Sequence, residues 1–171
     1  IWNDYINHPF VKDIGYGTLT KESFKYYLIQ DYLFLIQFGR AYALAAYKSE
    51  SLEEMRSAAA AMNTIINFEI QLHVEFCEGW GIPLDKLTKI PEDLATTAYT
   101  RFVLDCGNRG DLLDLMTALA PCVVGYAEIG RNLASIPSSK TENPYSNWIK
   151  MYSGNEYQEA SKDATNQLDI L

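Results

Sequence analysis

Residues 20–45 read TKESFKYYLIQDYLFLIQFGRAYALA, and this stretch decides the fold class. Apolar residues recur in it at steps of three and four, which is the spacing of one helix face. Thr20 is a suitable N-cap after the glycine-containing turn at residues 15–17, so we expect a helix from about Thr20. The face contains Phe24, Leu28, Asp31, Leu35, Phe38, Tyr42 and Ala45. Asp31 is the one charged residue in this otherwise apolar face.

A second long helix is expected to begin at Ser51, because Ser51 and Glu54 have the spacing of a capping box. The glycines at 79 and 81, followed by Pro83, are expected to end this helix. Its apolar face is expected to contain Met55, Ala58, Met62, Ile65, Glu69, Leu72 and Phe76, with His73 beside it.

Two further long helices are expected after residue 90. One runs from Leu94 to Cys106 and ends in the turn at residues 107–110, and the other begins after Asp111 as N-cap. Pro121 lies inside the second pattern and is expected to kink or restart that helix. The apolar face of this helix contains Leu112, Leu115, Leu119, Cys122, Tyr126, Ile129 and Leu133.

Two shorter helices complete the pattern. One is expected to start at Asn143-Pro144, and the Ser153-Gly154-Asn155 break separates it from a last helix. No window alternates apolar and polar residues as a strand would. The sequence therefore predicts an all-α bundle, with residues 1–171 forming a single domain.

Composition narrows the partners and the compartment. The chain has 22 acidic and 14 basic residues and no Lys/Arg cluster, which argues against a nucleic-acid partner. We find no apolar run near the ~20 residues of a membrane span and no signal peptide, so we expect no membrane partner. Three widely spaced cysteines argue against disulfides and predict reduced thiols in the cytoplasm.

Polar groups on apolar faces are the candidates for chemistry. A buried carboxylate such as Asp31 needs a partner, so it is either a structural ion pair or a group that reaches into a cavity. Free cysteines are often inert core residues, and Cys122 has the same open alternatives. Pro121 would place Cys122 near the N-terminus of a restarted helix, which favours a thiolate, and Tyr126 lies four residues further on the same face.

Glu69 and His73 are four residues apart and share a helix face. They could form a buried hydrogen-bonded pair or part of a metal site in a bundle. Such metal sites draw on more histidines, and this chain has only His8 besides His73. We therefore expect no metal.

Several segments together resemble the thiaminase II (TenA) family, which has a haem-oxygenase-like helical fold. They lie in the expected order along nearly the whole chain: His8-Pro9-Phe10, residues 27–32, residues 69–73, Pro121-Cys122 through Tyr126-Ala127-Glu128, and Asn143-Pro144-Tyr145 through Trp148-Ile149. The resemblance implies hydrolysis of thiamin or aminomethylpyrimidine to hydroxymethylpyrimidine, with no cofactor.

The resemblance also implies roles for individual residues. Cys122 would be the nucleophile, and Asp31 would contact the aminopyrimidine. The side chains expected around the substrate are those of Phe34, Tyr99, Tyr126 and Tyr145. Glu69 and His73 would not touch the substrate but would contact the residues that do.

Other expectations concern alternatives and assembly. A metal-dependent oxidase on the same fold would use Glu69, His73 and Glu128, whereas a regulator would bind a pyrimidine without turnover. The family resemblance suggests a homotetramer, with interface candidates Trp2, Tyr5 and Tyr32. Fusion to another thiamin-pathway enzyme is an open alternative, suggested by the missing start of the chain. The chain begins at Ile1 without a methionine and its last helix has no stop signal at Leu171. We therefore expect a fragment that lacks its start and a C-terminal helix carrying a catalytic glutamate.

Overall fold

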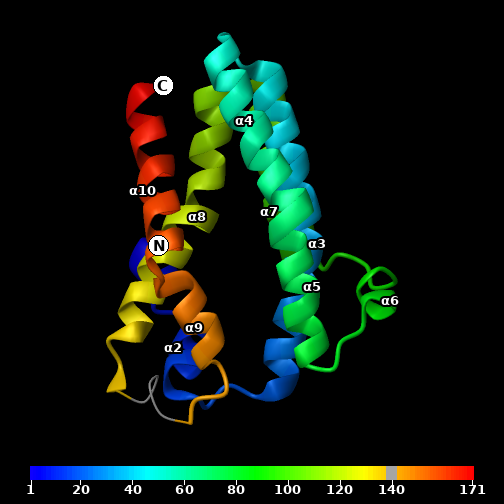
Figure 1. Cartoon of the computed structure of the whole chain (residues 1–171), viewed down its shortest axis with the longest axis vertical. Helices are drawn as coiled ribbons and strands as arrows, with labels where there is room; N and C mark the ends of the chain where they lie inside the picture. The colour runs from blue at the N-terminus through cyan, green and yellow to red at the C-terminus, as the bar shows by residue number, and fades with distance from the viewer. Residues whose placement is uncertain (138–141) are drawn as a thin grey trace. The chain divides into compact units, whose positions relative to one another are not determined.

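α3 (Lys21–Lys48) is the long helix expected from the opening stretch, and it is the helix on which its unit is built. The computed structural model describes residues 1–137 and 142–171, whose regular elements are all helical (Figure 1). The chain forms two compact units: residues 21–118, and residues 1–20 together with residues 119–171. The expected all-α class is confirmed for the described residues.

In the unit of residues 21–118, α3 contacts each of the neighbouring helices, and Figure 1 shows α4, α5 and α7 alongside it. These neighbours are α4 (Leu52–Thr64), the π-helical turn η1 (Ile65–Glu69), α5 (Ile70–Gly79), the short α6 (Leu84–Leu87) and α7 (Leu94–Arg109). The expected buried face of α3 is confirmed, because Phe24, Leu28 and Ala45 are at most 1% exposed. The capping box of Ser51 and Glu54 is also present at the start of α4.

The second expected helix contains a π-helical turn that the periodicity did not predict. A π turn holds an extra residue, so it shifts the phase of the helix that follows it. After η1 the buried residues are His73, Val74 and Cys77, whereas Leu72 is 60% exposed. The expected face was therefore wrong beyond Ile65, and His73 occupies the inward position that the sequence pattern assigned to its neighbour.

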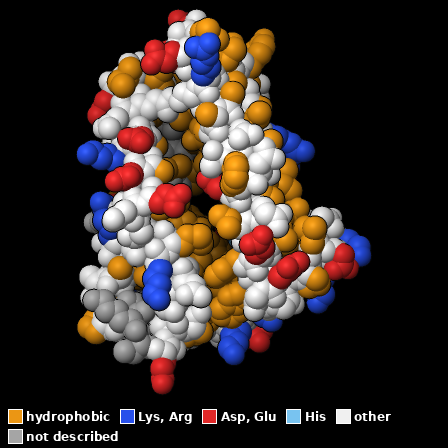
Figure 2. Space-filling view, in the orientation of Figure 1, with side chains coloured by type: hydrophobic (Ala, Val, Ile, Leu, Met, Phe, Trp, Pro, Cys, Tyr) orange, Lys and Arg blue, Asp and Glu red, His pale blue; other side chains and the backbone are white. Residues whose placement is uncertain are grey.

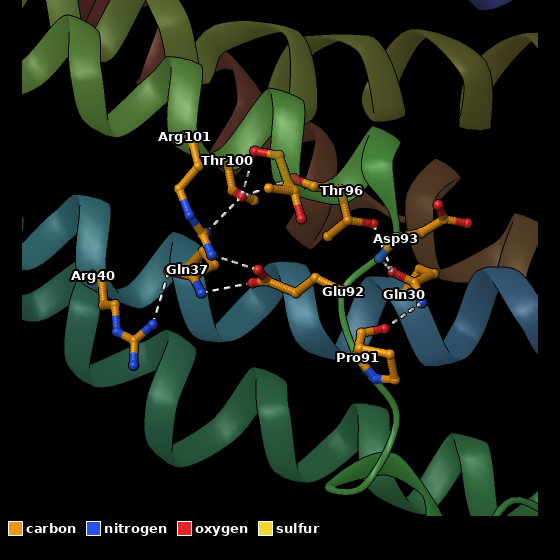
Figure 3. A network of polar contacts seen from close by, with 10 residues as sticks. Gln30, Gln37, Arg40, Pro91, Glu92, Asp93, Thr96, Thr100 and Arg101 are labelled. Carbon is orange, nitrogen blue, oxygen red and sulfur yellow. Dashed lines mark hydrogen bonds and ion pairs between the residues drawn. The ribbon is translucent and has the colours of Figure 1, made fainter.

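A polar network joins α3 to residues 91–93 and to α7 (Figure 3). The Gln30 side-chain oxygen accepts hydrogen bonds from the Asp93 backbone N–H (2.9 Å) and the Thr96 hydroxyl (2.8 Å). About two turns further along α3, the Gln37 side-chain amide donates a hydrogen bond to Glu92 at 2.7 Å. These bonds hold the start of α7 against α3.

The carboxylate of Glu92 is the charged centre of that network. It accepts from Gln37 and forms an ion pair with Arg101 at 2.5 Å. Burial alone would raise the pKa of Glu92, but the bonds from Arg101 and Gln37 hold it below its ordinary value. The network is therefore a satisfied structural contact between α3 and α7.

α7 continues three residues beyond its expected end, so the prediction of a turn at residues 107–110 was wrong in part. Gly107 lies inside the helix, where a Cβ atom would come within 2.8 Å of Leu44 and 2.9 Å of Leu115. Glycine is needed here because three helices pack closely at this residue. A glycine is also typical of a turn, so the sequence alone could not distinguish the two.

The unit of residues 1–20 and 119–171 contains two short helices that were not predicted, α1 (Trp2–Ile6) and α2 (Pro9–Tyr16). It also contains α9 (Ser146–Ser153) and α10 (Asn155–Ile170), which contact each other. α9 begins later than the expected Asn143-Pro144 start, because the side chain of buried Asn143 bonds to another helix. Its amide donates to the carbonyls of Ile14 and Gly15 at the end of α2, at 2.8 and 3.1 Å.

α8 (Leu112–Ala134) belongs to both units, and its N-cap Asp111 accepts from the Asp114 N–H at 3.0 Å. The helix passes Pro121 without interruption, so the expected restart at this residue was wrong. By length and composition alone, α8 could cross a membrane, which corrects the expectation that no apolar segment is long enough. Packed core helices pass the same test, so this finding is weak evidence for a membrane.

The face of the molecule in Figure 2 has acidic, basic and apolar side chains interspersed. The described residues on that face form no continuous basic patch.

Gly130 generates the first prediction, because α8 passes very close to the end of α9 at this residue. A Cβ atom at Gly130 would lie 2.5 Å from the Tyr152 carbonyl carbon, which is backbone and cannot rotate away. We expect Gly130→Ala to cost about 1–3 kcal/mol through overpacking. The melting temperature should fall by several degrees in thermal unfolding followed by circular dichroism.

Gly79→Ala is the matched control, since nothing lies within 4 Å of a Cβ atom at Gly79 in α5. Alanine favours a helix over glycine, so this variant should melt at the same temperature as wild type or higher. Equal melting temperatures for the two variants would contradict the close approach at Gly130.

Candidate functional site

Asp31 lies on the buried face of α3, as expected, and its side chain is only 11% exposed. The Tyr27 hydroxyl, one turn earlier on α3, donates a hydrogen bond to its carboxylate. His73 of α5 approaches from the other side, with its Nδ1 atom 3.5 Å from Asp31 Oδ2. Burial raises the pKa of Asp31, although the charge interaction with His73 and the bond from Tyr27 oppose the rise. Asp31 is thus a partnered but incompletely compensated carboxyl group.

His73 is held on both edges of its ring. Its Nε2 atom is 2.8 Å from the backbone carbonyl oxygen of Leu28, which lies one turn before Asp31 on α3. The side chain is 8% exposed. The imidazole therefore joins α5 to one turn of α3 through both ring nitrogens.

Glu69 and Cys77 are also close enough to interact with Asp31. Glu69 keeps an exposed surface, yet the pKa of its carboxyl is raised, first by loss of solvent and second by the charge of Asp31. Burial, with a smaller contribution from Asp31, raises the pKa of the Cys77 thiol to about 12. Cys77 is 0% exposed and remains a neutral thiol at pH 7.

Phe34 and Tyr99, two expected substrate contacts, lie together in this same unit. Their rings stack with centroids 6.0 Å apart and planes 16° apart, and the ring of Phe38 also stacks with that of Phe34, with centroids 5.4 Å apart. The Tyr99 hydroxyl donates to the Ala118 carbonyl at 2.9 Å. The pair therefore forms a flat aromatic surface between α3 and α7.

Cys122 lies within α8 in the other unit and is partly exposed. The prediction that a helix begins beside the thiol was wrong, because α8 is continuous through Pro121. No helix N-terminus therefore stabilises a thiolate at Cys122. The Cys122 thiol donates to the Leu119 carbonyl at 2.8 Å. The hydroxyls of Tyr5 and Tyr157 reach the carbonyls of Pro121 and Cys122, so this turn of α8 is well held.

Tyr126, one turn beyond Cys122, belongs to an aromatic cluster. Its ring contacts Tyr152 with centroids 4.9 Å apart and Trp148 at 6.0 Å. Tyr152 in turn contacts Trp148 at 4.5 Å and Tyr157 at 4.8 Å. The cluster packs α9 and the start of α10 against α8.

Tyr145, the remaining expected substrate contact, is 1% exposed in the same unit as Cys122. Its hydroxyl donates to the Leu19 carbonyl at 2.5 Å. This contact ties the chain before α9 to the end of the first segment, so a structural role accounts for the residue as described. A substrate contact at Tyr145 stays a prediction.

The structure thus gathers Asp31, Glu69 and His73 in one unit, which also holds Phe34 on α3 and Tyr99 on α7. The other unit holds Cys122, Tyr126 and Tyr145. Sequence reasoning missed Tyr27, although its spacing of four residues from Asp31 could have indicated it. It also missed Cys77 as a neighbour of Asp31, because the π turn decides that contact.

The side chains that could bind a metal ion do not cluster in the described part of the chain. In residues 1–137 and 142–171, no group of three or more His, Cys, Asp or Glu side chains is arranged to hold a metal ion. Glu128, the third ligand of the oxidase alternative, accepts a hydrogen bond from the Trp2 indole at 2.9 Å.

Comparison with known proteins identifies the family. The model of the TENA/THI-4/PQQC family matches residues 1–171. The chain belongs to this family. A TenA family transcription regulator from Silicibacter sp. TM1040, whose crystal structure is known, is 47% identical and superposes with a TM-score of 0.93, covering 99% of this chain and 74% of that one. The haem-oxygenase-like fold expected for this family is therefore confirmed.

Two relatives of known name are informative about the TENA/THI-4/PQQC family. The aminopyrimidine aminohydrolase of Halalkalibacterium halodurans is 37% identical over 169 residues, which are 99% of this chain and 75% of that protein. Hydroxymethylpyrimidine/phosphomethylpyrimidine kinase THI20 of Saccharomyces cerevisiae is 29% identical over 171 residues. The match covers 99% of this chain but 31% of the yeast protein, so the similar region is one part of a longer chain there.

The three cysteines generate the second prediction. Cys77 is sealed and its pKa is about 12, whereas Cys106 and Cys122 are partly exposed. We expect a disulfide reagent at pH 8 to label the native protein at no more than two thiols, and Cys77 only after unfolding. Cys77→Ser should leave the native thiol count unchanged, while Cys122→Ser lowers it by one. Rapid labelling of Cys77 in native protein, measured by mass spectrometry, would contradict its burial.

Proposed function

We propose that this protein is an aminopyrimidine aminohydrolase of the thiaminase II type. The observation that carries the proposal is 37% identity over 99% of the chain to a relative with that name, within a family that matches the whole chain. The substrate would be thiamin or aminomethylpyrimidine, and the pyrimidine product hydroxymethylpyrimidine.

In the proposed chemistry, the Cys122 thiolate adds to an electron-poor carbon of the pyrimidine ring. The electron pair moves to a ring nitrogen, which takes up a proton. The amine or thiazole then leaves from the methylene carbon with the bonding electron pair, and water adds to that methylene carbon and loses one proton to the released amine or to solvent. Breakage of the carbon–sulfur bond restores the aromatic ring and the thiolate. Covalent catalysis divides one difficult displacement into easier steps, and these steps require no cofactor.

Asp31 would bind the aminopyrimidine edge in this proposal. That edge offers an N–H donor from the amino group beside an acceptor ring nitrogen, and a carboxyl group with one proton available can match both. The raised pKa of Asp31 favours such a proton, and its burial strengthens each hydrogen bond.

Phe34, Tyr99, Tyr126 and Tyr145 would contact the flat substrate through ring faces or hydroxyls. Phe34 and Tyr99 already stack on each other within one unit, which supports an aromatic role for that pair. Glu69 and His73 would support Asp31. The charge interaction with His73 opposes the rise that burial causes in the pKa of Asp31, and Asp31 in turn adds to the rise that burial causes in the pKa of Glu69, so both residues interact with this carboxyl group.

A second candidate function is a pyrimidine-binding regulator without turnover. It is favoured by the similarity to the Silicibacter protein, which is described as a transcription regulator. Binding of aminomethylpyrimidine without product formation by the wild-type protein would select this alternative.

The proposal also covers the setting of the protein. All three cysteines are free, which supports a reducing compartment such as the cytoplasm. A homo-oligomer is proposed as well, with Trp2 as its best interface candidate because it is 39% exposed. Tyr5 and Tyr32 are weaker candidates, since Tyr5 bonds to Pro121 within the chain and Tyr32 is 8% exposed. Fusion to a kinase is also proposed, because the similar region of the yeast relative is one part of a longer protein that is named as a kinase.

Cys122→Ser tests the proposed nucleophile. A serine hydroxyl is barely ionised near pH 7, so turnover of aminomethylpyrimidine should fall at least ~10³-fold. Product formation is measured by liquid chromatography at saturating substrate. Cys77→Ser and Cys106→Ser are the controls and should remain active, because one thiol is sealed and the other lies on α7. Near-normal turnover by Cys122→Ser would refute the mechanism.

Asp31→Asn tests the proposed substrate carboxylate. Asparagine can still donate and accept at the aminopyrimidine edge, but it has no proton to give to the ring nitrogen, so kcat/KM should fall by roughly 10²–10⁴-fold. Because burial raises the pKa of Asp31, its ionised form destabilises the fold above its unfolded pKa, and the neutral amide removes this effect. The variant should therefore melt at the wild-type temperature or higher at pH 7. Lower stability with unchanged kcat/KM would make Asp31 structural.

A further inference from the structure

We propose that His73 is a positioning residue that shares one proton with Asp31, so that Asp31 meets the substrate with a proton it can give and recover. This inference deepens the proposed function and rests on it for the role of Asp31. It assigns to His73 a task beyond packing.

The Nε2 atom of His73 faces a backbone carbonyl group of α3. It lies 2.8 Å from the Leu28 carbonyl oxygen, which can only accept a hydrogen bond. The Nε2 atom must therefore carry a proton. In a neutral imidazole, a proton on Nε2 leaves a lone pair on Nδ1.

The Nδ1 atom of His73 faces the carboxyl group of Asp31. Asp31 Oδ2 is 3.5 Å away, and both side chains are nearly buried, at 8% and 11% exposed. A lone pair facing a carboxylate in such surroundings is repulsive, and no hydrogen bond can then form between Nδ1 and Oδ2. One additional proton between Nδ1 and Oδ2 removes the conflict, whichever of the two atoms holds it.

Other side chains also interact with the pair. Tyr27 of α3 donates to Asp31, and Glu69 of η1 and Cys77 of α5 interact with it electrostatically. Tyr27 stabilises the ionised carboxyl, whereas burial and an ionised Glu69 favour the protonated one. The balance keeps the proton of the pair transferable rather than locked on one atom.

The pair suits the proposed chemistry because thiolate addition sends an electron pair to a ring nitrogen. Asp31 gives its proton to that nitrogen and becomes a carboxylate that faces the Nδ1 lone pair of His73, an unfavourable arrangement that drives the return of the proton. When the carbon–sulfur bond breaks, the ring nitrogen returns the proton and the pair is restored. One proton leaves the pair and one returns, so the pair is restored and the reaction consumes only the substrate and water.

The position of His73 depends on the π turn. The five residues of η1 shift the helix phase so that position 73, rather than 72, faces α3. π turns inside α-helices occur frequently at functional sites, and here the turn places the one buried histidine beside the buried carboxyl.

Nitrogen-15 NMR of the histidine rings tests the shared proton directly. The chain has only two histidines, and the spectrum of His8→Gln assigns the signals of His73. Between pH 6 and 8, Nε2 of His73 should show a directly bonded proton. Asp31→Asn should shift the Nδ1 resonance, while Asp85→Asn, an exposed matched control on α6, should not. An unprotonated Nε2, or an Nδ1 resonance unchanged by Asp31→Asn, would overturn the shared proton.

Kinetics with His73→Gln tests the role in turnover. Glutamine can still donate to the Leu28 carbonyl or to Asp31, but it has no proton that titrates near pH 7. We expect kcat to fall roughly tenfold or more with little change in KM, and the pH profile of kcat to shift. His8→Gln should leave both unchanged. A merely structural His73 would lower the melting temperature but leave kcat and its pH profile unchanged below that temperature, and this result would overturn the inference.

The two possible failures are distinguishable. If the wild-type protein does not hydrolyse aminopyrimidines, the proposed function fails before any His73 variant is made, and so does the catalytic role of the pair. The NMR measurement then still decides whether the pair shares a proton. If wild type is active and His73→Gln behaves like wild type, only the role of His73 is refuted.

Discussion

Burial of the Asp31 carboxyl in the packed face of α3 is the constraint on which the rest of its unit depends. An ionisable group cannot remain there without partners, and Tyr27 and His73 supply them from α3 and α5. His73 can do so only because η1 shifts the phase of the following helix, and its second ring nitrogen is held by the Leu28 carbonyl. The geometry of α5 against α3 is thus tied to one carboxyl group.

Asp31 on α3 and Glu92, which bonds to α3, have pKa values shifted in opposite directions, and this difference separates a structural carboxyl group from a functional one. Glu92 is compensated by Gln37 and Arg101, so its pKa lies below the ordinary value and the ionised form stabilises the fold. Asp31 is only partly compensated, so its pKa is raised. Groups kept in an unfavourable state by the fold are candidates for function, because nothing about stability alone would retain them.

The other unit shows how a thiol can be placed firmly without a helix terminus. Tyr5 and Tyr157 donate to carbonyls in the turn of Cys122, and one turn further along α8 the ring of Tyr126 contacts those of Tyr152 and Trp148. The thiol of Cys122 is partly exposed, whereas Cys77 is sealed. Access, rather than the helix dipole, is therefore the feature that distinguishes the proposed nucleophile from the inert cysteine.

The sequence by itself determined the all-α class, the start of α3, the capping box at Ser51 and the charged residue in the face of α3. Each of these follows from local spacing, which neighbours along one helix decide. Only the tertiary structure decided the inward position of His73, the continuity of α8 through Pro121 and the helical place of Gly107. Local spacing carries no information on these points, because they depend on which side chain of another helix meets the residue.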